Sequence, residues 1–182
     1  KIENCILGNI PKNIYKIFHT DEFVKDEDTA FSGAKNKKTS MWLAVESVKN
    51  QKSDVVISAG NTGALFVVAK LNLEMIDNID KPALSGLWPN KKGMNVVLDL
   101  GANIDCNEKN LVDFSIMGSS LFKALYPDDE CKVALLNIGS EEIKGNEIIK
   151  NTYQKLSEKK NNFIFKGYIE GNKIMSGDVN VI

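Results

Sequence analysis

Residues 53–65 read SDVVISAGNTGAL, and this stretch decides the fold class. Its apolar, β-branched run predicts a strand, its glycine-bracketed middle predicts a loop, and the apolar spacing that follows predicts a helix. At Gly60 and Gly63 the missing Cβ atoms let the backbone approach a ligand, and the free N–H groups of a helix start favour an anion. We therefore expect a phosphate-sized ligand here. A tight turn of any α/β protein fits the spacing equally well, because the loop has neither the P-loop nor the dinucleotide-binding pattern.

Strand and helix patterns alternate on both sides of this stretch. Alternating apolar residues predict a strand at 14–18, and helical spacing begins at 39–40, where a threonine and a serine can cap it. Further along we expect strands at 82–88, 94–100, 133–138, 163–165 and 178–182, with a turn at 89–93. We also expect a helix at 108–126 that Asn107 can cap, and a helix at 146–157. This order predicts a single α/β domain over residues 1–182. Its sheet would be mostly parallel and covered on both faces, with ligands at the carboxyl ends of the strands.

The composition is that of an ordinary globular protein with 43% hydrophobic and 26% charged residues. The net charge is -1 and every basic residue is lysine, which argues against nucleic acid as a partner because arginine forks are absent. Three cysteines without a CxxC pair indicate a reducing compartment and no zinc site. The longest apolar stretches are too short to span a bilayer.

Three loops follow predicted strands, at 58–63, 99–103 and 137–146, and all three should open on one side of the sheet. They offer backbone amides together with polar side chains, which are Asn61, Asp99, Asn103, Asn137, Lys144 and Asn146. Such a cradle suits binding of a phosphate or a carbonyl group. It suits a nucleophile-and-base mechanism less well, because no serine elbow or second histidine completes a triad.

Several of these residues have a simpler interpretation. Asp99 is a single carboxylate without a clustered partner, so it is more typical of a residue that orients a loop than of a metal ligand. Lys144 either neutralises phosphate or is a surface lysine at a helix start. His19, the single histidine, is more typical of a packing or hydrogen-bonding residue than of a base. No metal and no cofactor is required by this pattern.

Beyond about residue 17, nearly all of the chain carries motifs of one family in that family's order. They are KKTSM at 37–41, SAGNTGAL at 58–65, DLGANIDC at 99–106, MGS at 117–119, LLNIG at 135–139, EEIKGN at 141–146 and GYIEG at 167–171. With these motifs the chain closely resembles the phosphate acyltransferase family of bacterial phospholipid synthesis, the PlsX type. Residues 1–16 match poorly, and Trp42 and Ser140 depart from the family pattern.

The resemblance implies an α/β protein with a three-layer, Rossmann-like sheet, similar to the isocitrate and isopropylmalate dehydrogenases. It implies transfer of a long-chain acyl group from acyl carrier protein to inorganic phosphate, giving acyl phosphate, without a cofactor. It also implies a cytoplasmic homodimer that associates peripherally with the membrane through a segment beyond residue 182. Family members are longer at both ends, so we expect the chain to be the central portion of a longer protein.

The reaction assigns roles to the candidate residues. Asn61, Asn103 and Lys144 are the catalytic candidates: Asn61 and Lys144 would hold phosphate, and Asn103 would orient the acyl carbonyl. The residues expected to bind phosphate or substrate are Ser58, Gly60, Thr62, Gly63, Asp99, Gly101 and Asn146. The candidates for docking the acidic carrier protein are Lys37, Lys38, Lys91 and Lys92.

Two other functions fit the same residues. One is a phosphate acyltransferase that uses coenzyme A thioesters. The other is a non-catalytic scaffold that binds carrier protein or dimerises, which the sparse acid–base groups suggest.

Overall fold

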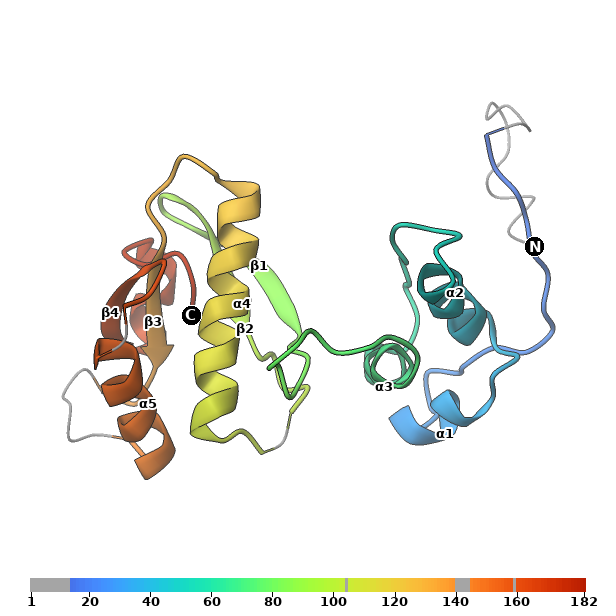
Figure 1. Ribbon diagram of the computed structural model, residues 1–182, viewed down its shortest axis with the longest axis horizontal. Coiled ribbons are helices and arrows are strands. Elements are labelled where there is room, and N and C mark those ends of the chain that lie inside the picture. The colour runs from blue at the N-terminus through green and yellow to red at the C-terminus, as the bar shows by residue number, and fades with distance from the viewer. Residues whose placement is uncertain (1–13, 104, 140–144, 159) are drawn as a thin grey trace. The chain divides into compact units, whose positions relative to one another are not determined.

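The computed structural model describes residues 14–103, 105–139, 145–158 and 160–182 (Figure 1). The chain forms two compact units, Lys1–Glu74 and Met75–Ile182, which are described separately below. Both helices and strands are present, so the predicted α/β class is confirmed at the level of a mixed α/β protein. The single domain over 1–182 stays a prediction.

In the first unit three helices share one core. They are α1 (Ala30–Lys35), α2 (Ser40–Lys49) and α3 (Thr62–Asn72). The buried side chains of this core are Ala34, Met41, Trp42, Val45, Ala64 and Val68. The side chain of Thr39 caps α2 by accepting a hydrogen bond from the Trp42 amide at 3.2 Å, and Asn61 caps α3 in the same way. The helices predicted from residues 39–40 and from the glycine-bracketed loop are therefore confirmed.

The strands predicted at 14–18 and at 53–58 are wrong for the described structure, which forms no strand in either stretch. Val56 packs against the core of the first unit, while the side chains of Val55 and Ile57 are 69% and 91% exposed. The apolar, β-branched run that predicted a strand at 53–58 is thus present, but within residues 14–74 no described segment pairs with it. A strand requires backbone partners that a local pattern does not supply.

The second unit holds a sheet built around its C-terminal residues. Strands β1 (Ser85–Asn90) and β2 (Gly93–Leu98) form an antiparallel hairpin, with its turn inside the predicted 89–93. Strand β3 (Lys132–Leu136) pairs in parallel with β4 (Ile164–Ile169). Val181 lies between the two pairs, because it makes parallel bridges to both Val96 of β2 and Val133 of β3. The order is β1, β2, the C-terminal segment, β3 and β4, and it is parallel from β2 onward.

Opposite faces of this sheet carry different cores. Helices α4 (Glu108–Leu125) and α5 (Glu147–Glu158) contact each other, and both contact strands of the sheet. The first cluster, on the side of α4, contains Val96, Phe122, Cys131, Val133 and Val181. The second cluster contains Val97, Ala134, Ile169, Val179 and Ile182, with Ile174 of the 3-10 helix η1 (Gly171–Ser176) packed against it. Neighbouring residues of a strand face opposite sides, which is why Val96 and Val97 belong to different clusters.

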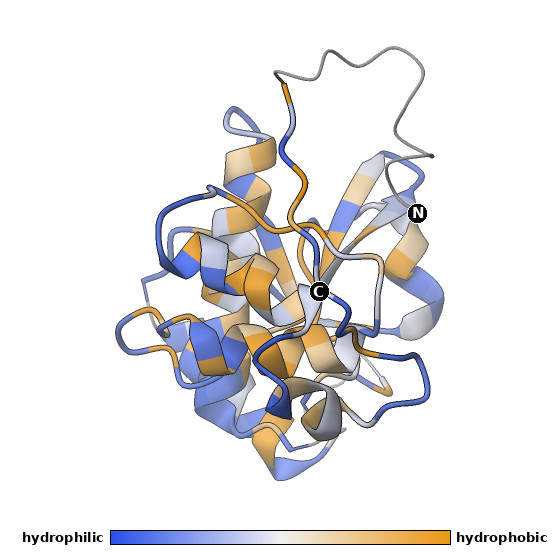
Figure 2. Ribbon diagram, turned by 90° about the vertical axis from the view of Figure 1, so that its right-hand side faces the viewer, coloured by the Kyte–Doolittle hydropathy of each residue, from blue (hydrophilic) through white to orange (hydrophobic). Residues whose placement is uncertain are grey.

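The helix starts and ends follow local signals in this unit as well. Asn107 and Asn110 form a reciprocal capping box at the start of α4, at 2.9 and 3.1 Å. The helix ends at Leu125, before Pro127, as the sequence predicts. Figure 2 shows apolar and polar segments interleaved along the helices, as expected when one face of a helix is buried.

Gly118 lets α4 lie directly on the sheet. A Cβ atom built at Gly118 would be 2.5 Å from both Leu98 Cδ1 and Val181 Cγ1. We predict that Gly118→Val lowers the free energy of unfolding by about 1–3 kcal/mol, since overpacking a tight contact forces its neighbours apart. Ser120→Val, at an exposed position of the same helix, is the matched control for β-branching. Equal urea midpoints for the two variants would contradict this contact.

Candidate functional site

The loop after β2 is held together by Asp99. Its Oδ1 atom accepts a hydrogen bond from Asn103 Nδ2 at 3.1 Å, and its Oδ2 atom accepts one from Cys106 Sγ at 3.5 Å. Asn103 Nδ2 also donates to the Pro82 carbonyl at 3.0 Å, so both of its amide hydrogens are engaged. Gly101 turns the loop with a φ of +79°, a conformation that favours glycine. The loop is therefore a preformed polar turn at the end of a parallel strand.

Burial and the nearby Asp99 carboxylate raise the pKa of the Cys106 thiol, which consequently stays protonated and acts as a donor. Burial raises the pKa of Cys131 to about 11. Neither group has the lowered pKa of a nucleophilic cysteine. Cys106 therefore serves as a hydrogen-bond donor within the loop, and Cys131 is a buried residue of the core.

The loop after β3 begins at Asn137, which is buried, and its Oδ1 atom accepts a hydrogen bond from the Ile138 amide at 2.9 Å. Gly145 lies against it, because a Cβ atom at Gly145 would be 2.7 Å from Asn137 Oδ1. Asn146 is exposed and accepts a hydrogen bond from the Ile149 amide at 2.9 Å, which caps α5. Lys144 lies outside the described residues. Gly145, near the end of the loop, thus lies close to the side-chain amide of Asn137 at its beginning.

The loops after β2 and β3 leave the same edge of the sheet. Both strands run parallel to the C-terminal segment, so their carboxyl ends coincide, as the sequence predicts. Lys91 and Lys92 lie in the hairpin turn at the opposite end of β2, roughly 20 Å away at about 3.3 Å per residue. Lys92 pairs with Asp178 at 2.7 Å and lowers the pKa of that carboxyl. The structure therefore does not bring these two lysines to the loops.

In the first unit the loop at 58–63 is largely exposed. Asn61 Oδ1 accepts from the Ala64 amide at 2.9 Å, and its Nδ2 atom donates to the carbonyls of Asp26 and Asp28 at 3.2 and 3.1 Å. This side chain is accordingly occupied in holding the loop to the start of α3. The amides of Thr62 and Gly63 donate to no acceptor within the described part of the chain, so they remain available to an anion.

The glycines of this loop allow close packing inside the protein. A Cβ atom at Gly63 would lie 3.3 Å from Ala30 Cβ, and one at Gly60 would lie 3.3 Å from Met41 Cε. The Ser58 hydroxyl accepts a hydrogen bond from the Gly60 amide at 3.2 Å. Close approach of a ligand to these glycines stays a prediction, whereas their close approach to α1 and α2 is observed.

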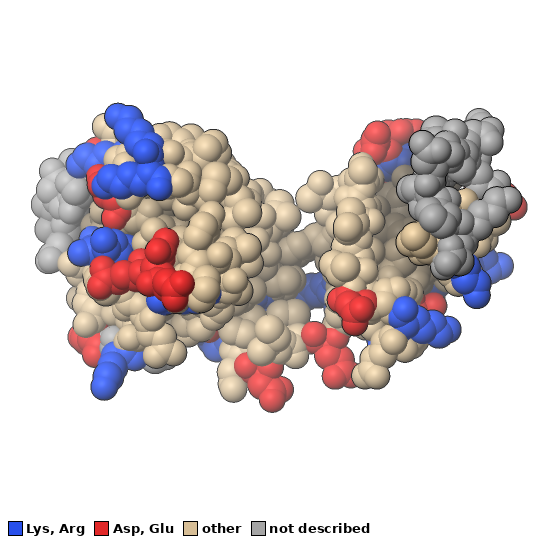
Figure 3. All heavy atoms as spheres, turned by 90° about the horizontal axis from the view of Figure 1, so that it is seen from above, with Lys and Arg blue, Asp and Glu red and all other residues tan. Residues whose placement is uncertain are grey.

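Lysines and acidic residues are interspersed on the surface. Lys37 and Lys38 are exposed, and Lys37 Nζ lies 5.4 Å from the centre of the Trp42 ring. Figure 3 shows lysine side chains beside acidic ones on the face of the second unit that it presents. Among residues 14–103, 105–139, 145–158 and 160–182, no group of three His, Cys, Asp or Glu could hold a metal ion. None of the described helices is long and apolar enough to cross a membrane.

A cavity of about 130 Å³, which no pattern in the sequence predicts, lies at the same sheet edge. It lies between the sheet, α4 and α5, and Asp99 forms part of its wall. Most of its other lining is apolar, including Leu98, Leu111, Phe114, Val133, Ile149 and Val181. The apolar spacing of the two helices signalled buried faces, but only the packed structure shows the space left between them.

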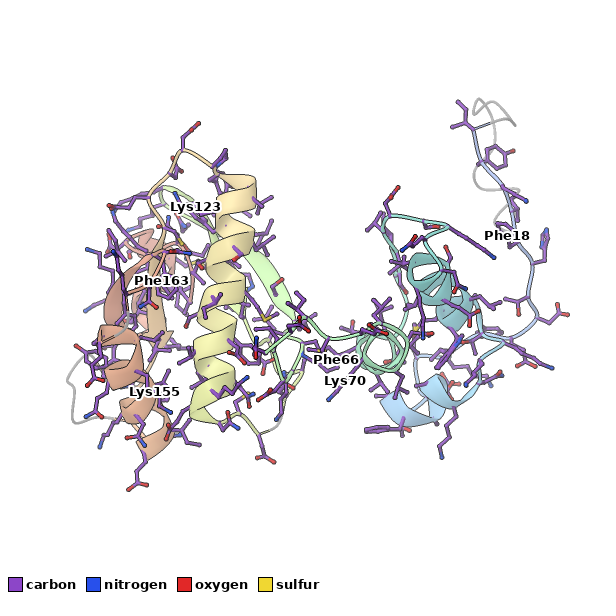
Figure 4. All side chains as sticks on the ribbon, viewed as in Figure 1. Phe18, Phe66, Lys70, Lys123, Lys155 and Phe163 are labelled. Atoms are coloured by element: carbon purple, nitrogen blue, oxygen red, sulfur yellow. The ribbon has the colours of Figure 1, made fainter. Side chains whose placement is uncertain are left out.

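Glu108 joins the two helices that border the cavity. Its Oε1 atom accepts a hydrogen bond from Asn151 Nδ2 at 2.7 Å, and its Oε2 atom is ion-paired with Lys155, which Figure 4 labels on α5. The hydrogen bond from Lys155 lowers the pKa of Glu108. The start of α4 is therefore tied to the middle and the last turn of α5.

The second unit has the arrangement of α/β proteins that bind small ligands at the carboxyl ends of parallel strands. The chain belongs to the fatty acid synthesis protein family, which it matches over residues 2–182. It is 69% identical to a phosphate acyltransferase of Pelagibacter ubique over 184 aligned residues, which are 100% of this chain and 55% of the relative. Phosphate acyltransferases of Paramagnetospirillum magneticum and Neorickettsia sennetsu are 41% and 39% identical, covering 97% and 100% of this chain and 51% and 54% of their own lengths. The chain thus spans about half the length of these curated relatives.

The Glu108 contact makes stability depend on pH. Because its folded pKa is lowered, the contact stabilises the fold fully above the ordinary glutamate pKa of about 4.3, and this stabilisation is lost as pH falls through the folded pKa. We predict that Glu108→Gln lowers the urea midpoint at neutral pH, and that its difference from the unsubstituted chain shrinks in acid. Glu147→Gln, at the first residue of α5, controls for charge at a helix start. An unchanged midpoint for Glu108→Gln at neutral pH would count against the contact.

Proposed function

We propose that this chain is the central part of an enzyme that transfers a long-chain acyl group from acyl carrier protein to inorganic phosphate, giving acyl phosphate. The observation that carries the proposal is the 69% identity, across the whole chain, to a relative named a phosphate acyltransferase. The Asp99 loop and the free amides at the start of α3 each support it, because the reaction needs groups that bind a carbonyl and phosphate. For the whole protein we propose the three-layer, Rossmann-like arrangement implied by the resemblance.

The reaction requires few acid–base groups from the protein. A phosphate oxygen attacks the thioester carbonyl carbon, the C–O bond forms, and the C–S bond breaks with release of the carrier thiol, which takes up a proton. Phosphate is already a competent nucleophile, so the protein must chiefly orient it and stabilise the oxyanion. Orientation supplies about 7–11 kcal/mol in favourable cases. One oxyanion donor is worth about 10²- to 10³-fold in rate.

The described residues support separate roles for the loops. In the first unit, the free amides of Thr62 and Gly63 at the start of α3 bind phosphate, and Asn61 holds them in place through its cap. In the second unit, Asp99 holds the loop that presents Asn103. Asn103 exchanges its hydrogen bond to the Pro82 carbonyl for one to the acyl carbonyl. For Lys144, which lies outside the described residues, the family resemblance supports a role in adding positive charge for the phosphate.

Carrier protein and membrane are further parts of the proposal. Lys37, Lys38, Lys91 and Lys92 are exposed and present positive charge to an acidic carrier, an attraction that weakens with added salt. The family resemblance supports a cytoplasmic homodimer that associates peripherally with the membrane through segments outside this chain.

The first test uses the chain within its full-length protein and long-chain acyl carrier protein, with and without inorganic phosphate. We expect release of the carrier thiol to require phosphate and to yield acyl phosphate. If acyl coenzyme A is used in preference to acyl carrier protein when both are present, the acyl donor is the coenzyme A thioester. Binding of the carrier without phosphate-dependent release would overturn the enzyme in favour of a scaffold.

The role of the α3 amides has a sharper test. Proline is tolerated at the first position of a helix, so Thr62→Pro removes one N–H group and leaves α3 intact. We predict a rise in the KM for phosphate of about 10- to 100-fold, the effect of losing a hydrogen bond to a charged group worth roughly 1.5–3 kcal/mol. Thr62→Ala keeps the amide and removes only the hydroxyl, so it is the matched control. An unchanged phosphate KM in a folded Thr62→Pro protein would refute the assignment.

A further inference from the structure

The cavity between α4, α5 and the sheet presents apolar surface although two polar residues line it. Ser115 Oγ donates to the Leu111 carbonyl at 2.9 Å, within its own helix. The carboxylate oxygens of Asp99 accept from Asn103 and Cys106. These polar groups are therefore already paired inside the protein. What remains toward the space is chiefly the side chains of Leu, Ile, Val and Phe residues.

The size of the space suits a short length of hydrocarbon. Its volume is about 130 Å³. A cavity of roughly 150 Å³ lined by similar side chains stays dry and binds benzene. The lining is mostly apolar, so filling the space with methylene groups removes apolar surface from water and is favourable.

The position of the cavity connects it with the polar loop. Asp99 belongs both to its wall and to the turn that presents Asn103, so an apolar chain in the cavity would have its polar end at this turn. The walls on the helix side are Leu111 and Phe114 of α4 and Ile149 of α5. Glu108 links these helices through Asn151 and Lys155, which maintains the separation between the walls.

We propose that this cavity holds the methylene carbons of the acyl group that follow the thioester carbonyl. This assignment rests on the proposed function and adds the subsite that recognises the chain. A fatty acyl donor brings an extended apolar chain directly attached to a polar reacting group. The cavity matches this arrangement, because the polar Asp99 loop lies at one part of its wall and apolar side chains form most of the rest.

The test fills the cavity with one larger side chain. Ile149→Phe places a ring against a wall of the cavity, whereas Ile116→Phe makes the same change on α4 at a position 37% exposed and outside the cavity lining. Val133→Ile adds a single carbon to another wall and serves as a milder second variant. All variants are made in the full-length protein, and their folding is checked by circular dichroism and thermal unfolding.

Two measurements on these variants decide the proposal. Calorimetric titration with hexadecanoate reports binding without turnover, and kcat/KM for acetyl, octanoyl and hexadecanoyl donors reports use of the chain. We expect Ile149→Phe to weaken hexadecanoate binding at least about tenfold and to reduce the hexadecanoyl-to-acetyl ratio similarly, with a smaller decrease for Val133→Ile. That factor corresponds to the transfer of about two methylene groups.

The possible results test the acyl subsite and the proposed reaction independently of each other. Equal hexadecanoate affinity in Ile149→Phe, Ile116→Phe and the unsubstituted protein would overturn the acyl subsite, whether or not the enzyme turns over. Absence of phosphate-dependent thiol release with every donor would instead contradict the proposed function. In that case the hexadecanoate titration alone still decides whether the cavity binds an acyl chain.

Discussion

Parallel backbone pairing of the C-terminal segment is the constraint on which the second unit depends. The Leu98 amide donates to the Ile182 carbonyl, the Ile182 amide donates to the Val96 carbonyl, and the Ala134 amide donates to the Val181 carbonyl. These bonds join the β1–β2 hairpin to the β3–β4 pair. They bring the carboxyl ends of β2 and β3 to one edge, and they complete both cores. The Asp99 loop, the Asn137 loop and the wall of the cavity all follow from this single insertion.

Asparagine side chains shape the loops of this protein. Asn61, Asn107 and Asn146 each accept a backbone hydrogen bond at the start of a helix, and Asn103 connects Asp99 to the Pro82 carbonyl. A side-chain amide that caps a helix is a poor first choice as a phosphate ligand, since using it for a substrate removes the hydrogen bond that starts the helix. Exposed backbone amides at the start of α3 carry no such cost. We therefore favour recognition of phosphate by backbone amides, with the asparagine side chains holding the loops in shape.

The proposed reaction and the cavity address two parts of one substrate. Orientation of phosphate and polarisation of a carbonyl account for the chemistry at the head of an acyl donor, and neither recognises the length of its chain. Burial of methylene groups against Leu111, Phe114 and Ile149 supplies that recognition from the non-reacting part. Close attachment of α4 to the sheet at Gly118, and of α4 to α5 at Glu108, keeps these walls in place.

Local sequence determined the parts of this protein that depend on neighbouring residues. The caps at Thr39 and Asn107, the turn at 89–93 and the helix stop before Pro127 follow from side-chain and backbone chemistry within a few positions, and the structure confirms them. Tertiary structure alone decided what depends on distant partners. It left 53–58 without a strand, bound Asn103 to Pro82, and opened a cavity between helices. Pairing and packing join residues far apart in the chain, and periodicity shows which face is buried without showing what it meets.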